Sequence, residues 1–240
     1  MRSQKIRRFD VVISLGKSCQ AAYQMKRRGL RTKSGPFDWF TVPTAGLFTV
    51  LESDFENFMQ QDNLTEVNNR RGYLVVRDNI TKIQSLHDFH ANQTIQETWP
   101  SFRDKMERRI KAFKKDLAES PNVLFIRHGI LREESIRLIN LLKSIRRGKP
   151  CTLLALDQSF SDTEEPYDKD IISMHMPQQD NSWKGSNAEW NRVLSHIGLS
   201  YFSFRQYQDR FACIPIIEKI QKRLSALDSV LFGRKRPVIR

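Results

Sequence analysis

Short apolar runs along the chain have the length and composition of buried β-strands. Phe9–Leu15 reads FDVVISL and ends at Gly16, Asn122–Arg127 reads NVLFIR, and Cys151–Leu156 reads CTLLAL. Unbroken runs of about four to eight apolar, often β-branched residues are typical of strands that are covered on both faces, as in a parallel sheet. A further strand is expected at Asp170–His175 (DIISMH).

Helical segments are predicted between these runs. Ser18–Arg28 follows the first strand, with Ser18 as a candidate N-cap and Gly29 as the stop. Two alternating segments, Tyr73–Arg77 and Lys82–His87, predict a pair of strands joined by a turn. The other expected helices are Thr44–Leu51, Asp54–Gln61, Trp99–Ala118, Glu133–Arg147, Ala188–Ile197 and Ile216–Leu227.

This alternation of strands and helices is typical of βαβ units. We therefore predict an α/β protein with a single domain, built on a mainly parallel, doubly wound sheet that is flanked by helices. The predicted domain covers residues 1–228, and residues 229–240 form a basic C-terminal tail (FGRKRPVIR follows Leu231).

The charge of the chain changes the picture of its partners. Its 240 residues include 40 Lys and Arg against 27 Asp and Glu, which gives a net charge of +13. Such a protein attracts anions, so we expect non-specific binding to polyanions, with a merely solvated basic surface as the alternative. No zinc finger, reading helix or RNA-binding aromatic motif is visible, and the substrate is unknown.

Cysteine usage and hydropathy bear on the compartment. Cys19, Cys151 and Cys213 are too scattered for a disulfide framework, and no Cys-x-x-Cys pair predicts zinc binding. The N-terminal apolar run is too short for a signal peptide, and no stretch reaches the ~18–20 apolar residues of a membrane span. We expect a cytoplasmic protein that uses no metal and no cofactor.

Cys19 is the candidate for chemistry. It falls in the first turn of the helix that follows the first buried strand, where exposed N–H groups and the helix dipole stabilise a thiolate, and Lys17 adds a positive charge. The alternative is a small apolar residue that packs in the core. Gly16-Lys17-Ser18 lacks the upstream glycine of a Walker loop, although an anion can still bind at this helix N-terminus.

A nucleophilic cysteine also needs a base, and three histidines are expected at the carboxyl ends of strands. His87, His128 and His175 each follow or end a predicted strand, which places them at the edge of the sheet that carries Cys19 if the strands are parallel. A lone histidine is more often structural. His87 and His90 lie three residues apart in a segment that we expect to be strand and loop, so they are not expected to ligate a metal.

One block of the chain resembles a known family. The run from Ile13 to Trp39 is similar to the signature I-S-L-G-x-x-C followed by L-R-x-x-S-x-P-F-D-W of uncharacterised proteins described as papain-like cysteine peptidases. The resemblance covers roughly residues 9–155 and includes further elements downstream of this block. They are His87-Asp88-Phe89, Arg108-Arg109-Ile110 with Phe113, and Leu124-Phe125-Ile126-Arg127.

The resemblance implies roles for individual residues. Cys19 would be the nucleophile, His87 the general base, and Asp38 or Asp88 the carboxylate that orients the imidazole. Gln20 follows the cysteine here, whereas papain-like enzymes have a glutamine before it, so backbone N–H groups would form the oxyanion hole. The sequence thus predicts a cysteine hydrolase or acyl transferase, with a non-catalytic or transferase-type protein that binds anions, phosphate or glycans as the alternative.

Overall fold

The structure is a computed structural model that describes residues 6–163, 165–178, 182–200 and 203. By its internal contacts the chain divides into two compact units, residues 1–199 and 200–240, and the fold below is that of the first. The helix predicted at residues 216–227 and the tail predicted at 229–240 lie outside the described residues, so the boundary at residue 228 stays a prediction. Among the described residues, no helix is long and apolar enough to cross a membrane.

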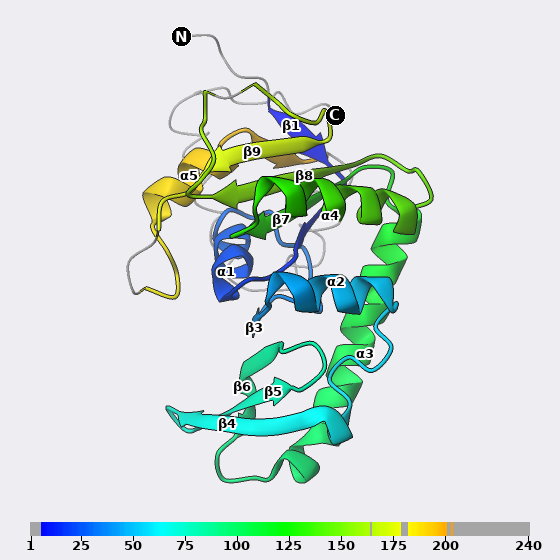
Figure 1. The fold of residues 1–240 in the computed structure, drawn as a ribbon, viewed down its shortest axis with the longest axis vertical. Coiled ribbons are helices and arrows are strands. Elements are labelled where there is room, and N and C mark those ends of the chain that lie inside the picture. The colour runs from blue at the N-terminus through cyan, green and yellow to red at the C-terminus, as the bar shows by residue number, and fades with distance from the viewer. Residues whose placement is uncertain (1–5, 164, 179–181, 201–202, 204–240) are drawn as a thin grey trace, which may run out of the picture. The chain divides into compact units, whose positions relative to one another are not determined.

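A parallel sheet forms the upper part of the molecule in Figure 1, in the strand order β2-β7-β8-β9. A short parallel pair, β1 with β10, continues from the amino end of β2. The three runs that the sequence predicts as neighbouring strands are neighbours here, because β7 pairs in parallel with both β2 and β8. The strands are β1 (Arg7–Phe9), β2 (Val11–Ser14), β7 (Val123–His128), β8 (Cys151–Asp157), β9 (Ile171–His175) and β10 (Ile197–Leu199).

Helices cover both faces of this sheet, which explains why its strands are apolar without alternation. Val12 and Leu124 belong to a cluster with side chains of α1 and α5, whereas Ile13 and Phe125 belong to the larger cluster with α2, α3 and α4. Successive residues of a strand point to opposite faces, so each strand contributes to both clusters. The helices are α1 (Cys19–Arg27), α2 (Thr44–Glu52), α3 (Ile95–Glu119), α4 (Arg132–Ile145) and α5 (Asn187–Leu194).

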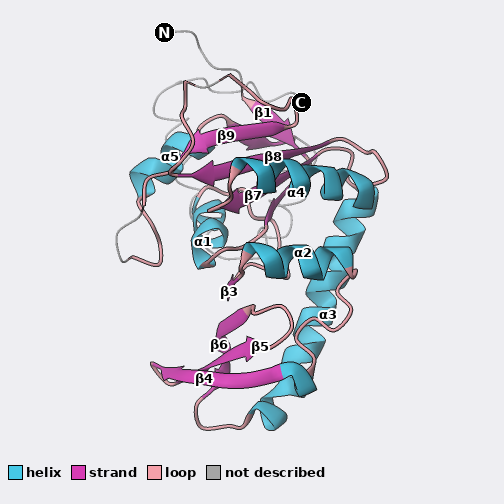
Figure 2. Cartoon of the chain, viewed as in Figure 1, coloured by secondary structure: helices cyan, strands magenta, loops and turns pink. Residues whose placement is uncertain are grey.

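A second, antiparallel sheet has the order β3-β6-β5-β4 (Figure 2), with β3 before α2 in the chain and the other three strands after it. Its strands are β3 (Phe40–Thr41), β4 (Leu64–Arg70), β5 (Tyr73–Asp78) and β6 (Gln84–His90). The α/β class is confirmed, but the sequence analysis had not foreseen a second sheet of this size, and a doubly wound topology stays a prediction. The connections explain the antiparallel order, since Arg71 and Gly72 form a tight turn with φ of 53° and 81° that can join only antiparallel neighbours.

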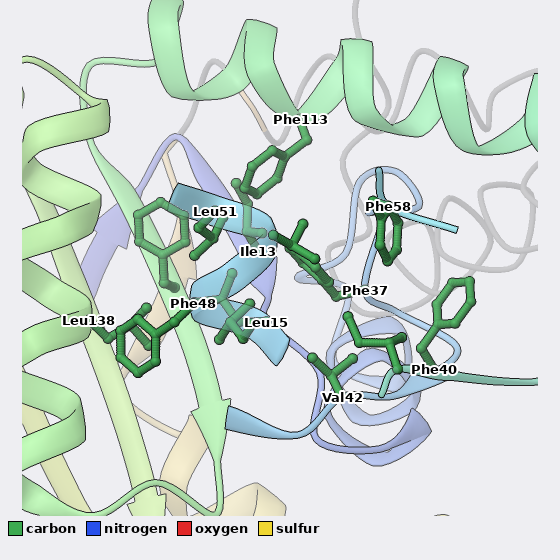
Figure 3. Packing of buried hydrophobic residues seen from close by; sticks show 14 of the residues in the cluster. Ile13, Leu15, Phe37, Phe40, Val42, Phe48, Leu51, Phe58, Phe113 and Leu138 are labelled. Atoms are coloured by element: carbon green, nitrogen blue, oxygen red, sulfur yellow. The ribbon is translucent and has the colours of Figure 1, made fainter. Parts of the chain in front are cut away.

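Phenylalanines pack the core between α2, α3 and the antiparallel sheet (Figure 3). Phe37 stacks on Phe55 at 5.6 Å between ring centroids and meets Phe113 of α3 edge-on at 6.0 Å. Phe40 of β3 packs edge-on against Phe58 at 6.2 Å. The Pro-Phe-Asp-Trp block therefore contributes Phe37 to the core.

The helix predicted at Asp54–Gln61 is wrong. This segment is a loop with positive φ at Asp54, Phe55, Asn57 and Met59, and a short 3-10 helix follows at Gln61–Asn63. Distant side chains satisfy its backbone, because the Met59 N–H donates to the Asp78 carboxylate (2.8 Å) and the Met59 carbonyl accepts from the Trp99 indole N–H (3.0 Å). A local pattern cannot report such partners.

Two other predicted helix boundaries shift. The third helix, α3, begins four residues before the predicted Trp99, where Thr94 and Glu97 form a capping box. The predicted helix Ala188–Ile197 ends at Leu194, and the next residues form β10 against β1, so Gly198 lies in a strand instead of stopping a helix.

Candidate functional site

The turn from β2 into α1 needs glycine at its first position. Gly16 and Lys17 both have left-handed backbones, with φ of 82° and 72°. A Cβ at Gly16 would lie 2.6 Å from Cγ2 of Val42, so no other residue fits without a shift. Ser18 is the predicted N-cap, and its hydroxyl accepts from the Gln20 N–H at 3.4 Å.

Cys19 is the first residue of α1, as predicted, but its environment is not the expected one. The residue is 5% exposed. The pKa of the Cys19 thiol is raised to about 11, mainly by burial and with smaller contributions from the nearby Asp88 and Asp38 carboxylates, while the Cys19 backbone N–H acts in the opposite direction. The expectation of a thiolate stabilised by the helix N-terminus and Lys17 is therefore wrong, because desolvation and two negative charges outweigh the helix end.

Asp38 is buried and organises the loop before β3. Its Oδ2 accepts from the Arg31 guanidinium (2.7 Å) and from the Gly35 N–H (2.8 Å), and Arg31 also donates to Ser34 (2.7 Å). Burial raises the pKa of Asp38, and the charge of Arg31 opposes this shift. These contacts hold together the loop at residues 31–38, which belongs to the predicted signature and precedes β3.

His87 and Asp88 lie on β6, in the antiparallel sheet. The ladder with β5 is irregular here, since Ser85 and Phe89 pair with Val76 and Leu74 while the residues between them have no partner in the register. The His87 side chain is exposed, with its ring 5.9 Å from that of Tyr73. Asp88 instead accepts from the Ser85 hydroxyl (2.6 Å) and from Lys105 of α3 (2.5 Å).

The fold thus brings Cys19, Asp38 and Asp88 together from α1, a loop and β6. Arg109 of α3 joins them, since both carboxylates act on its charge, and its Nη1 is buried without a hydrogen-bond partner. No hydrogen bond between an imidazole and the Cys19 sulfur exists among the described residues. Within the same residues, no three His, Cys, Asp or Glu side chains gather as metal ligands.

His128 and His175 end parallel strands, as predicted, and so lie at the sheet edge where β2 leads into α1. Nδ1 of His128 is buried without a hydrogen-bond partner, and its ring meets Trp190 edge-on at 6.1 Å. Burial, and to a lesser extent the charge of Lys17, lowers the pKa of His128 to about 4. His175 Nδ1 faces the carbonyls of Gln158 (3.1 Å) and Phe160 (3.2 Å), which indicates a structural role.

Sequence reasoning missed Arg127, which ends the apolar run of β7. Its side chain is 1% exposed, and its guanidinium donates to the backbone just before Gly16. The available signal was a charged residue at the end of a strand that is otherwise fully apolar, since a charge in such a place needs specific partners.

Comparisons with known proteins agree with the N-terminal signature. A family model described as "Putative papain-like cysteine peptidase (DUF1796)" matches residues 10–153. The chain is also similar to "Uncharacterized protein R408" of Acanthamoeba polyphaga mimivirus, with 26% identity over 219 residues that cover 76% of this chain and 96% of the relative. No solved structure matches the chain. With more than half of its length matched, including Cys19, Asp38 and His87, the chain belongs to this papain-like cysteine peptidase family.

Proposed function

We propose that the protein is a cysteine hydrolase or acyl transferase in which Cys19 attacks a carbonyl carbon. The observation that carries the proposal is the position of Cys19, inside the family match and at the first residue of a helix that follows a buried strand. The N–H groups of the first turn can stabilise a developing negative charge by donating hydrogen bonds to it. The substrate of such a reaction is an ester, an amide or a thioester, and the family description does not name the compound that carries this group.

The raised pKa of the thiol specifies how the reaction would start. With a thiol pKa of about 11, Cys19 carries its proton at neutral pH, so a resting thiolate–imidazolium pair is not the reactive form. A base would take the proton as the sulfur–carbon bond forms, and the leaving group would then depart with that proton. Water or another acceptor would finally attack the thioester and release Cys19 as a thiol.

His87 is the proposed base, with Asp38 as the carboxylate that supports the site. His87 precedes Asp88, whose charge acts on Cys19, so a local rearrangement of the irregular part of β6 would turn the imidazole toward the sulfur. His128 is the second imidazole to test, because its free Nδ1 lies at the same sheet edge as the start of α1. Either imidazole would take the proton only where substrate binding brings it within hydrogen-bond reach of the Cys19 sulfur.

The test uses p-nitrophenyl acetate as a simple acyl donor. Wild-type protein should release p-nitrophenolate and carry an acetyl group on Cys19 that mass spectrometry detects after acid quenching. Cys19→Ser should lower the rate by orders of magnitude with little change in melting temperature, because the serine hydroxyl is a much poorer nucleophile. His87→Ala and His128→Ala then identify the base.

Cys151→Ser is the matched control, since Cys151 is also buried, at 4% exposure against 5% for Cys19. It should keep the wild-type rate. Full activity in Cys19→Ser would exclude the nucleophile. A loss of activity that only follows a loss of stability, in both serine variants alike, would mean that Cys19 is a packing residue.

A specific observation favours a second candidate, an anion-binding site at the start of α1. The Lys17 side chain lies against Gly129, so its charge adds to the first-turn N–H groups at the edge of the sheet. Inorganic phosphate should then raise the melting temperature of Cys19→Ala as much as that of wild type, and Lys17→Met should abolish this shift. An unchanged melting temperature in phosphate would exclude this candidate.

A further inference from the structure

Arg127 is a buried cation with no carboxylate within ion-pair distance among the described residues. Its Nη1 donates to the Leu15 carbonyl (3.0 Å), and its Nη2 donates to the Val42 carbonyl (2.9 Å) and the Thr44 hydroxyl (3.1 Å). Its Nε has no hydrogen-bond partner. Carbonyl and hydroxyl dipoles therefore compensate a charge that has been removed from water.

Stability of α2 does not explain this arrangement. Thr44 is the first residue of α2, and the N-terminus of a helix repels a positive charge. The guanidinium thus lies where the helix dipole disfavours it. The planar guanidinium instead links two backbone segments, at Leu15 and Val42, that are 27 residues apart in the chain.

The contacts close a ring around the turn that leads to Cys19. Arg127 joins the Leu15 carbonyl to the Val42 carbonyl, and the Val42 N–H donates to the Lys17 carbonyl (3.2 Å). Gly16 lies inside this ring, and Val42 packs against the side of Gly16 where another residue would carry its Cβ. Leu15 and Val42 belong to the same hydrophobic cluster, part of which Figure 3 shows. Both residues before Ser18, the N-cap of α1, are therefore held from the same side.

We infer that Arg127 is a positioning residue for Cys19: its fork to Leu15, Val42 and Thr44 fixes the Gly16–Ser18 turn and with it the first residue of α1. The inference rests on the proposed role of Cys19 as the nucleophile. It assigns to Arg127 no contact with substrate. Loosening the fork uncovers the sulfur and at the same time misplaces it for catalysis.

The test measures carboxamidomethylation of Cys19 by iodoacetamide in the folded full-length chain, from neutral to alkaline pH, with peptide mass spectrometry to separate the three cysteines. Arg127→Lys keeps the charge but loses the fork, and Arg127→Met loses both. In both variants Cys19 should react faster than in wild type, by up to about 100-fold at pH 8 if its pKa returns from about 11 to the ordinary 9.0. Acyl-transfer activity should fall in the same samples.

Arg146→Met is the matched control. Arg146 is also 1% exposed, and it donates to carbonyls, among them those of Leu117 (2.8 Å) and Ser120 (2.8 Å), away from the turn before α1. Its loss should lower stability without changing the pH profile of Cys19. If both Arg127 variants fail to fold, Thr44→Val, which removes a single acceptor of the fork, should still speed alkylation of Cys19.

Opposite movement of the two readouts, faster alkylation with slower acyl transfer, supports the inference. The inference is wrong if the rate of Cys19 alkylation depends on pH in the same way in Arg127→Lys and Thr44→Val as in wild type and Arg146→Met. A wrong assignment of Cys19 as the nucleophile would give a different result. Cys19→Ser would then keep its activity, whether or not the arginine variants change the alkylation of Cys19.

Discussion

At the scale of single residues, charge and solvent access decide the chemistry of the candidate site. Cys19 lies at a helix N-terminus, which favours a thiolate, yet burial and two carboxylates leave it protonated. His128 is half-buried near the charge of Lys17, and both effects favour its neutral form. Each of these shifts can be measured in solution.

The reactivity of Cys19 toward iodoacetamide should follow a pKa of about 11. Only the thiolate reacts, so at pH 8 the folded protein should be alkylated at Cys19 about 100-fold more slowly than the denatured chain, whose thiol has the ordinary pKa. Asp88→Asn removes one of the charges that raise this pKa and should speed the reaction. Equal rates in the folded and denatured protein would contradict the structure of the site.

The pH dependence of stability should report His128. Its pKa is about 4 in the folded protein, against 6.5 when exposed, so the unfolded chain binds a proton more readily between these values. The free energy of unfolding should therefore rise with pH across this window, and His128 should contribute up to about 3 kcal/mol above pH 6.5 that is lost as the pH falls toward 4.

His128→Gln lacks this titration. Urea unfolding between pH 4 and 7 should give a flatter profile for this variant than for wild type. His196→Gln, in the turn before β10, serves as the control for the loss of an imidazole elsewhere in the fold. Parallel profiles for wild type and His128→Gln would show that His128 does not titrate as described.

At the scale of elements, close backbone contact limits what a helix can carry. Alanine usually stabilises a helix relative to glycine by about 1 kcal/mol. Gly46 lies inside α2, where a Cβ would be 2.1 Å from the carbonyl oxygen of Thr81, in the turn before β6. Glycine here allows the helix and the antiparallel sheet to approach each other.

Gly46→Ala should therefore destabilise the protein, by about 1–3 kcal/mol, in spite of the better helix propensity of alanine. The displaced atom belongs to the backbone and cannot rotate away. Denaturant unfolding measures the change, and Thr49→Ala on the exposed side of α2 is the control, with an expected change of at most about 0.5 kcal/mol. A stabilising Gly46→Ala would disprove the close approach.

At the scale of the whole molecule, the excess of positive charge predicts that the partners include polyanions. A net charge of +13 creates a long-range attraction for polyanions that does not depend on a reading motif. The attraction acts through counterion release, so it is salt-dependent. We expect such binding in addition to the proposed site at Cys19.

The protein should bind a heparin column at about 0.05 M salt and elute well before about 0.5 M. Double-stranded DNA of unrelated sequences should bind with similar affinities, because no sequence-reading element is predicted. Retention that is unaffected by salt would refute an electrostatic origin. A strong preference for one DNA sequence would reveal a reading element that the sequence analysis missed.

The sequence by itself determined the parallel strands and the helices next to them. The runs at β2, β7 and β8 are contiguous and apolar, and the α1 signals, Ser18 and Gly29, stand at its ends. Such features depend on neighbouring residues alone, so a local pattern reports them. The same holds for the position of Cys19 at the start of α1.

The sequence also predicted the strand pair β5 and β6, but only the tertiary structure decided that β3 and β4 extend this pair into a second sheet, and only it decided the loop at residues 53–60 and the electrostatics of the site. Strand pairing and backbone partners such as Asp78 and Trp99 come from distant parts of the chain. The pKa of Cys19 depends on burial and on Asp38 and Asp88, which other segments bring close, and the buried fork of Arg127 depends on Leu15 and Val42. Desolvation and charge act through space, so the order of residues along the chain does not reveal them.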